Sequence, residues 1–212
     1  NLEAVSVSHA LEPGAIPAQA LVDEYLPPYQ PEHFLDPGRG ESWGNVVSQD
    51  MYYRHRRAIG AAMEQAVAAA EDADAEWHRR TGRRWGIIER YRCEDASLVF
   101  ATMGSMCGTA REAVDELRSA GHAVGLLKLR LFRPFPVAEL RAALAGVRDV
   151  VVLDRNFSPG AGGVLHQELR AALYGMEGAP AVHGYLTGVG GVNVPPAKIS
   201  ELAARARAHS PR

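Results

Sequence analysis

Several common signals are scarce or absent in this sequence of 212 residues. Its two cysteines, Cys93 and Cys107, form neither a CxxC pair nor part of a four-ligand set, so an iron–sulfur cluster or a structural zinc would need ligands from elsewhere. We interpret them as buried or half-buried thiols of a cytoplasmic protein. No apolar run approaches the ~18–20 residues that span a bilayer. No secretory leader is recognisable at the start, so we expect no membrane association.

Excess charge of one sign is also missing. The chain has 23 Lys and Arg against 25 Asp and Glu, a net charge of −2, which gives no electrostatic basis for binding nucleic acid. With 47% hydrophobic and 23% charged residues, the composition is that of a soluble globular protein. The first residue is Asn1 rather than Met. We therefore expect the chain to be processed or cut from something longer.

The usual catalytic motifs do not occur. The sequence has no HExxH, no GxSxG, no GxxxxGK[ST] and no GxGxxG in the order that nucleotide binding requires. Ser105, in the stretch Met-Gly-Ser-Met, is interpreted as the cap of the following helix rather than as a nucleophile.

Two segments precede the region of regular structure. Residues 1–49 are rich in proline and show no sustained hydrophobic period, which predicts an irregular arm or interdomain linker with a short helix near 18–25. Residues 50–84 predict one long helix, because apolar residues recur every three or four positions: Ile59, Met63, Ala66, Ala70, Ala73 and Trp77. We expect this helix to pack on the sheet domain that follows. A coiled-coil partner helix is the alternative.

Residues 85–212 alternate between strand-like and helical segments. The predicted strands are 85–91, 98–103, 123–131, 150–154 and 181–186, and the predicted helices are 105–120, 137–145, 163–174 and one from 195 onward. Such alternation indicates βαβ units. The apolar run 150–153 predicts a central strand, and the mixed run 85–91 predicts an edge strand. We predict an α/β fold, a three-layer α/β/α sandwich with a five-stranded, mostly parallel sheet and an N-terminal extension.

Polar and glycine-rich residues gather where these strands end, which is where ligands bind in open α/β sheets. The ends hold Gly104 with Ser105, Arg130 with Arg133, Asp154 to Asn156, and turns that contain Gly160 and Gly190. One interpretation is an anion site, in which backbone N–H groups and an arginine hold a phosphate or carboxylate. The other is structural: the glycines permit tight turns, and the arginines pair with Asp154 or with a partner surface.

Four motifs occur in a fixed order along the chain: MGS at 103–105, GLLKLRLFRPFP at 125–136, LDRN at 153–156 and GVGG at 188–191. Together they resemble the pyruvate:ferredoxin (flavodoxin) oxidoreductase family. The resemblance covers about residues 43–200, because 43–80 also looks like the family's long helix before the sheet. The chain is similar to the C-terminal portion of the family's α subunit, or to the equivalent second domain of the single-chain enzymes. This implies a transketolase C-terminal-like domain with one antiparallel edge strand.

The resemblance also implies a reaction, in which a 2-oxoacid, coenzyme A and an oxidised carrier give acyl-CoA, carbon dioxide and a reduced carrier. The family uses thiamine diphosphate with Mg²⁺ and iron–sulfur clusters. This sequence lacks a GDG…N diphosphate motif, a catalytic glutamate context and a cysteine cluster. We therefore predict no catalytic, cofactor-binding or metal-binding residue on this chain. The markers that carry over are Gly104, Ser105, Arg130, Arg133, Pro134, Pro136, Asp154, Arg155 and Asn156, and Gly160 and Gly190 join them as interface candidates.

We thus expect a structural or assembly domain of the α subunit in a cytoplasmic, oligomeric oxidoreductase, with pyruvate as its 2-oxoacid. The expected partners are the preceding thiamine-pyrimidine domain of the α subunit, a β subunit, an iron–sulfur subunit, and ferredoxin or flavodoxin. Arg130 and Arg133 are expected to brace the sheet end and an interdomain contact through their planar guanidinium groups. The alternative is a free-standing α/β module that binds a small anion or a CoA-like ligand at its strand ends.

Overall fold

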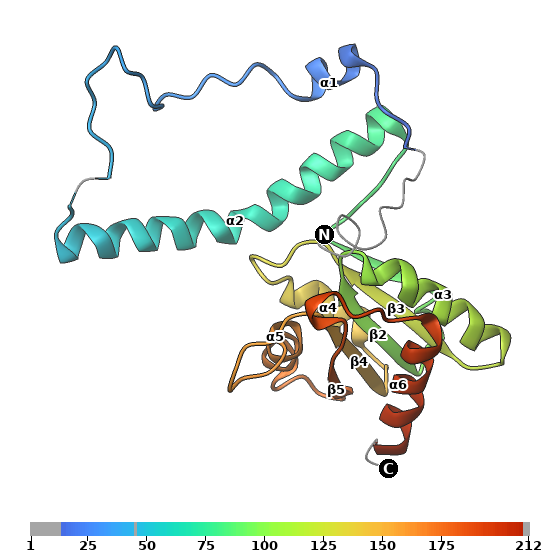
Figure 1. Cartoon of the computed structure of the whole chain (residues 1–212). Coiled ribbons are helices and arrows are strands. Elements are labelled where there is room, and N and C mark those ends of the chain that lie inside the picture. Colours follow the sequence, from blue (N-terminus) through green and yellow to red (C-terminus); the bar gives the residue numbers. More distant parts are fainter. Residues whose placement is uncertain (1–13, 45, 210–212) are drawn as a thin grey trace. The chain divides into compact units, whose positions relative to one another are not determined.

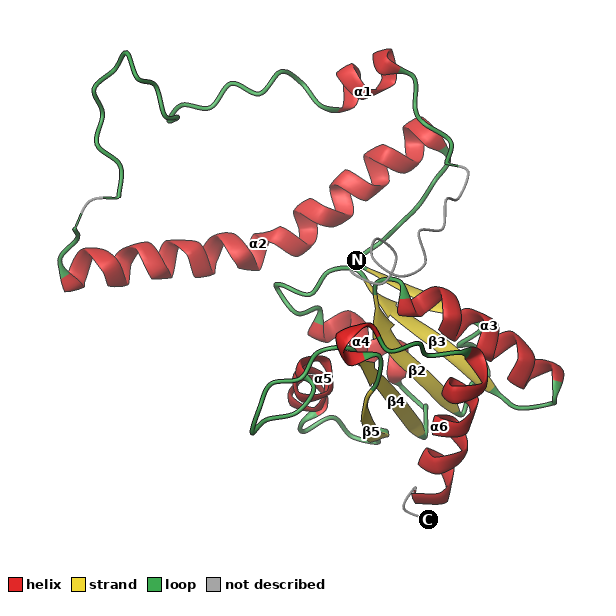
Figure 2. Ribbon diagram, viewed as in Figure 1, coloured by secondary structure: helices red, strands yellow, loops and turns green. Residues whose placement is uncertain are grey.

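The computed structural model describes residues 14–44 and 46–209. The chain divides into two units, Pro13–Arg84 and Trp85–Arg212, called here the arm unit and the sheet unit. Figure 1 labels helices α1 to α6 and strands β2 to β5, and Figure 2 separates helices from strands by colour. None of the helices in the described ranges combines the length and the apolar character that crossing a bilayer requires.

Five strands form the sheet unit's sheet, in the order β1-β3-β2-β4-β5. Their bounds are β1 Ile88–Tyr91, β2 Leu98–Met103, β3 Val124–Leu129, β4 Asp149–Asp154 and β5 Ala181–Leu186. Strands β2 to β5 are parallel, and β1 is antiparallel to β3 at one edge. Every residue of β4 is buried, as the apolar run in it predicts. The predicted α/β fold, with a mostly parallel five-stranded sheet and one antiparallel edge strand, is confirmed.

Two predicted strands are shorter in the structure. Strand β1 begins at Ile88 rather than at 85, because Gly86 takes a left-handed backbone with φ of 64° and turns the chain just before it. Strand β3 ends at Leu129 rather than at 131, because the N–H groups of Arg130 and Leu131 both donate to Ile87 O, at 2.9 and 3.0 Å. Because the Ile87 carbonyl accepts hydrogen bonds from both N–H groups, the regular pairing between β1 and β3 ends there.

The sheet unit's own helices cover both faces of the sheet. They are α3 Met106–Ser119, α4 Val137–Leu144, α5 Val164–Leu173 and α6 Pro196–His209. Helices α3 and α6 pack with Phe100 in one buried cluster, and α4 and α5 pack with Val99 in the other. Figure 2 shows these helices arranged around the strands of the sheet. Neighbouring residues of a strand point to opposite faces, so Val99 and Phe100 enter different clusters. The three-layer prediction is therefore confirmed.

The arm unit contains two helices, α1 Gln19–Tyr25 and α2 Gln49–Thr81. Helix α2 begins where the Ser48 hydroxyl accepts a hydrogen bond from Met51 N, and it ends at Gly82, whose φ is 70°. The long helix lies where its apolar period predicts it. None of the described residues 14–44 and 46–84 is buried. The predicted packing of this helix on the sheet domain stays a prediction.

Candidate functional site

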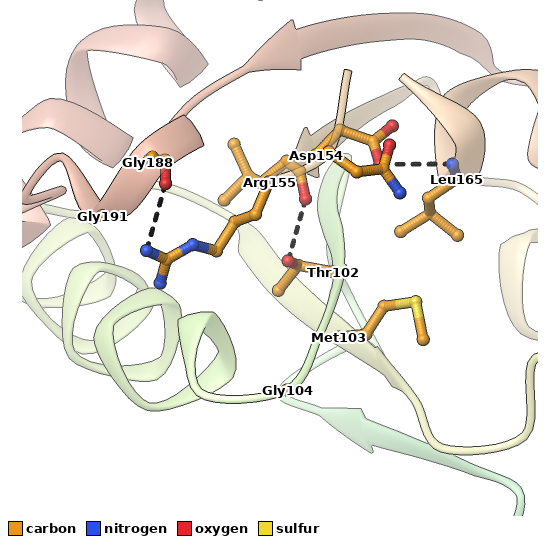
Figure 3. A pocket seen from close by; sticks show the side chains of 11 residues that line it. Thr102, Met103, Gly104, Asp154, Arg155, Leu165, Gly188 and Gly191 are labelled. Carbon is orange, nitrogen blue, oxygen red and sulfur yellow. Dashed lines mark hydrogen bonds between the residues drawn. The ribbon is translucent and has the colours of Figure 1, made fainter. Parts of the chain in front are cut away.

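A pocket of about 440 Å³ opens where β2 and β4 end (Figure 3). Residues 102–104 come from the end of β2, 153–156 from the end of β4, Leu165 from α5, and Gly188, Gly190 and Gly191 from the turn after β5. Parallel strands bring their carboxyl ends to one edge of the sheet, so segments distant in sequence meet here. Of the residues predicted from the sequence, the pocket brings together Gly104, Asp154, Arg155, Asn156 and Gly190.

Asp154 is buried, and its carboxylate holds the start of α5. Oδ1 accepts a hydrogen bond from Leu165 N at 3.2 Å, and Oδ2 accepts one from His166 N at 2.9 Å. The first N–H groups of a helix have no partner within it, and the helix dipole favours a negative charge there. The anion position at the start of α5 is therefore filled by the protein's own carboxylate.

Two neighbours complete this arrangement. Asn156 Oδ1 accepts a hydrogen bond from Val164 N at 3.0 Å, so the LDRN motif supplies acceptors to three successive N–H groups. At Gly163 a Cβ atom would lie 2.2 Å from Asp154 Oδ2, which only glycine avoids. The role of Gly163 was not identified from the sequence, although its place in the glycine run at 160–163 was the available signal.

The other polar groups of the pocket join the ends of neighbouring strands. Arg155 Nη2 donates to Gly188 O at 3.1 Å, and Thr102 Oγ1 donates to Leu153 O at 3.0 Å (Figure 3). Arg155 is the one cation among the described lining residues. Gly188 and Gly190 both have a φ of 70°, so the turn that carries the acceptor needs glycine. These contacts fix the shape of the pocket.

Arg130 and Arg133 do not line the pocket. Arg130 forms an ion pair with Glu89 on the edge strand β1, and its guanidinium lies 5.4 Å from the centroid of the Trp85 ring. Arg133 Nη2 contacts Glu168 Oε1 on α5 at 2.5 Å. Within the sheet unit, the two arginines thus tie the end of β3 to an edge strand and to a helix. An interdomain contact of either one stays a prediction.

Ser105 and Gly160 also lie outside the pocket lining. Ser105 has helical backbone angles, φ −65° and ψ −27°, and its side chain makes no capping hydrogen bond, so the predicted cap is wrong. A capping side chain reaches the N–H groups ahead of it from an extended backbone, which Ser105 lacks. The turn before α3 is made by Gly104, with φ of 67°. Gly160 sits in the turn closed by Ser158 N and Gly162 O at 2.9 Å.

Neither thiol suits metal or redox chemistry. Cys93 and Cys107 are buried in the two clusters on opposite faces of the sheet. Burial raises the pKa of both thiols, that of Cys107 to about 11. Among the residues that the structure describes, no three His, Cys, Asp or Glu side chains are grouped as a metal site requires. These residues do not fit an iron–sulfur cluster.

Residues 96–199 match the family model for pyruvate:ferredoxin oxidoreductase core domain II. The chain belongs to this family. It is 41% identical over 204 residues to the pyruvate synthase subunit PorA of Methanothermobacter thermautotrophicus, and the match covers 96% of this chain and 52% of that protein. It is 40% identical over 187 residues to the ketoisovalerate oxidoreductase subunit VorA of Pyrococcus abyssi, and that match covers 87% of this chain and 47% of that protein. The predicted family membership is confirmed.

The chain therefore spans about half the length of the relatives it matches. Because the match to PorA covers 96% of the chain, it includes the arm unit as well as the sheet unit. Among solved structures, a 2-oxoglutarate:ferredoxin oxidoreductase from Magnetococcus marinus aligns with a TM-score of 0.45 and 21% identity, over 70% of this chain and 23% of that chain. The fold is assigned from the strand order and from the helices that cover the two faces of the sheet.

Proposed function

We propose that this chain is a non-catalytic assembly domain of the α subunit in a thiamine-diphosphate-dependent 2-oxoacid:ferredoxin or flavodoxin oxidoreductase. The observation that carries the proposal is the 41% identity to a pyruvate synthase subunit over 96% of the chain. We propose pyruvate as the 2-oxoacid, because the pyruvate synthase subunit matches more of the chain than the ketoisovalerate oxidoreductase subunit does, 96% against 87%. The complex oxidises the 2-oxoacid with CoA to acyl-CoA and carbon dioxide, and it reduces its electron carrier.

The geometry of the pocket supports an assembly role. Asp154 and Asn156 hold the start of α5, Arg155 holds the turn after β5, and the Thr102 hydroxyl donates to a strand carbonyl. An acid, base or nucleophile must be free to exchange a proton or an electron pair with substrate. These side-chain atoms already hydrogen-bond to the backbone of the sheet unit, so they are poorly placed to exchange a proton or an electron pair with substrate.

The cofactors of the proposed complex then belong to other parts of it. We propose that thiamine diphosphate, Mg²⁺, the iron–sulfur clusters and CoA are held by the preceding thiamine-pyrimidine domain, the β subunit and an iron–sulfur subunit. Ferredoxin or flavodoxin receives the electrons through that complex. The two buried thiols of this chain support this division, because they do not fit cluster ligation.

The test is an anaerobic purification of the tagged subunit from its native host. Mass spectrometry identifies the copurifying polypeptides, and reduction of a viologen dye is followed with pyruvate or 2-oxoisovalerate in the presence of CoA. We expect thiamine- and cluster-binding partners and faster reduction with pyruvate. Recovery of the subunit alone, with saturable binding of CoA or phosphate, would favour the free-standing binding module instead.

Arg133→Ala should weaken assembly before it alters substrate affinity. The Arg133 side chain is half exposed, and an exposed ion pair contributes only ~0–1 kcal/mol, so the substitution should leave the sheet unit folded. We expect less assembled complex by size-exclusion chromatography, with an unchanged KM for pyruvate in what assembles. Glu168→Gln is the matched control, because it breaks the same ion pair and keeps the arginine. A raised KM with normal assembly would contradict this role.

A further inference from the structure

A second, smaller cavity of about 170 Å³ lies beside the start of α5 and is called here the small cavity. Its lining includes Asp154 from β4, His166 from α5, and Gly184 and Tyr185 from β5. Asp154 also lines the pocket at the strand ends, so it forms part of the wall of both hollows. Histidine is the side chain whose charge ordinarily changes between pH 5 and 8, so His166 can make this region respond to pH.

The imidazole ring of His166 lies against the backbone of β5. A Cβ atom added at Gly184 would lie 2.4 Å from Cγ of the ring and 2.6 Å from its Cδ2, so only glycine leaves room for the ring there. The ring also interacts with the backbone of Val182, two residues earlier on the same strand. His166 thus joins the start of α5 to β5, an edge strand of the sheet.

The main chain of His166 is held by a different strand. Its N–H donates to Asp154 Oδ2 at 2.9 Å, and the N–H of Leu165 donates to Oδ1 of the same carboxylate at 3.2 Å. The first N–H groups of a helix have no acceptor within the helix, so both depend on Asp154. His166 therefore contacts β5 through its ring and β4 through its N–H, and a displacement of this residue affects both contacts.

A positive charge on the ring is disfavoured in this position. The charged and titratable groups around it are Asp154 from β4, Arg170 from its own helix and Tyr185 from β5. Burial of the ring and the nearby Arg170 guanidinium lower the pKa of His166, and the Asp154 carboxylate and the Val182 backbone oppose this only in part. Both oxygens of Asp154 accept hydrogen bonds from the backbone of α5, so the carboxylate serves those N–H groups rather than the imidazole.

We propose that His166 is an acid-sensitive switch at the start of α5. When the ring takes up a proton, it leaves Gly184, turns into the small cavity and pairs with the Asp154 carboxylate. The carboxylate is then drawn away from the N–H groups of Leu165 and His166, and the first turn of α5 loosens. Because Asp154 also lines the pocket at the strand ends, the wall of that pocket changes with pH. All of these contacts lie within the sheet unit, so the switch operates whether or not the chain joins a larger enzyme.

Acid pH favours the displaced ring. Against Gly184 the pKa of His166 is lowered from its ordinary value of 6.5, whereas pairing with a carboxylate raises the pKa of an imidazole. The displaced ring therefore binds its proton at a higher pH than the ring against Gly184 does, and acidification shifts the equilibrium toward displacement. The contact with Gly184 is complete well above pH 6.5 and is lost as the pH falls below that value.

Amide hydrogen exchange of the 212-residue chain, followed residue by residue by NMR, tests the switch. Protection factors, which correct for the intrinsic effect of pH on exchange, are compared at pH 7.5 and pH 5. We expect the Leu165 and His166 amides to lose at least about threefold in protection at pH 5, relative to the amides of residues 110–113 in α3. The ring resonances of His166 should change over the same pH range.

Two histidine variants separate this switch from a general effect of acid. His166→Gln removes the titration, so the Leu165 amide should keep its protection at pH 5. His122→Gln is the matched control, because His122 is exposed just after α3, and this variant should lose protection as the wild type does. The thermal midpoint at pH 7.5 shows whether each variant folds.

Two results overturn the switch. One is a loss of protection that persists in His166→Gln. The other is a wild-type ring that titrates while the Leu165 and His166 amides keep their protection, and this result needs no variant. It therefore decides the matter even if His166→Gln does not fold.

Discussion

At the scale of single residues, the contact between Gly163 and Asp154 decides how α5 begins. A methyl group at position 163 would lie 2.2 Å from Asp154 Oδ2 and 2.6 Å from its Cγ, so Gly163→Ala must displace a buried carboxylate from two N–H groups. We expect it to destabilise the chain by about 1–3 kcal/mol in urea unfolding.

Gly108→Ala is the control for this substitution. Gly108 is an exposed residue of α3, and a Cβ atom added there would have no other group within 4 Å. Alanine at this position should therefore stabilise the helix by about 0.5–1 kcal/mol. Equal effects of the two substitutions would contradict the contact that we describe at Gly163.

The Cys107 thiol gives a prediction at alkaline pH. Burial raises its pKa from 9.0 to about 11, so the folded chain holds this proton more tightly than the unfolded chain does. Its contribution to stability is therefore complete below pH 9 and is lost as the pH rises toward 11, by at most about 1.4 kcal/mol per pH unit. Urea unfolding of wild type and Cys107→Ala under reducing conditions measures this. The difference in unfolding free energy should shrink above pH 9, and a constant difference from pH 7 to 10 would refute it.

At the scale of secondary-structure elements, helices α2 and α3 should differ sharply in protection. Residues 51–60 of α2 are all exposed, whereas α3 buries Met106, Cys107, Ala110, Ala113 and Val114. Local opening needs little free energy where few apolar contacts break. Hydrogen exchange of the chain alone, read by mass spectrometry, should be at least about a hundredfold faster in 51–60 than in α3. Similar rates would mean that the arm unit is held by contacts beyond those described here.

The elements of the sheet unit could be predicted from the sequence, because the apolar period gives both the type of an element and the face it buries. The ion-pair partners of Arg130 and Arg133 could not be predicted in this way. Glu89 lies 41 positions from Arg130, and Glu168 lies 35 positions from Arg133, so local spacing contains no sign of either pair. Ser105 shows a second limit. Its residue type predicts a cap, but its helical backbone, set after the turn at Gly104, keeps the hydroxyl from that role.

The candidate pocket, too, could be predicted only in part. The glycines and the arginine at the strand ends predict where the pocket lies, because parallel strands end at one edge of the sheet. The sequence does not reveal that Asp154 and Asn156 already serve the N–H groups of α5. That depends on the path of residues 157–163, an irregular turn with no period from which to predict it.

At the scale of the whole molecule, the two units should differ in their ability to fold alone. The sheet unit has two buried clusters covered by its own helices, whereas no described residue of the arm unit is buried. We expect residues 85–212 expressed alone to melt cooperatively, and residues 13–84 alone to show little helix by circular dichroism. A cooperative transition of the arm by itself would contradict this, as would a failure of the sheet unit to fold.

The length of α2 has a consequence for what can cover it. Its 33 residues, at 1.5 Å each, extend over ~50 Å along the helix path. A compact body of the sheet unit's size has a diameter of only ~36 Å, from its radius of gyration of ~14 Å. A single domain of that size is therefore shorter than the helix. Any surface that contacts α2 along its whole length must be elongated, or it must be built from more than one domain.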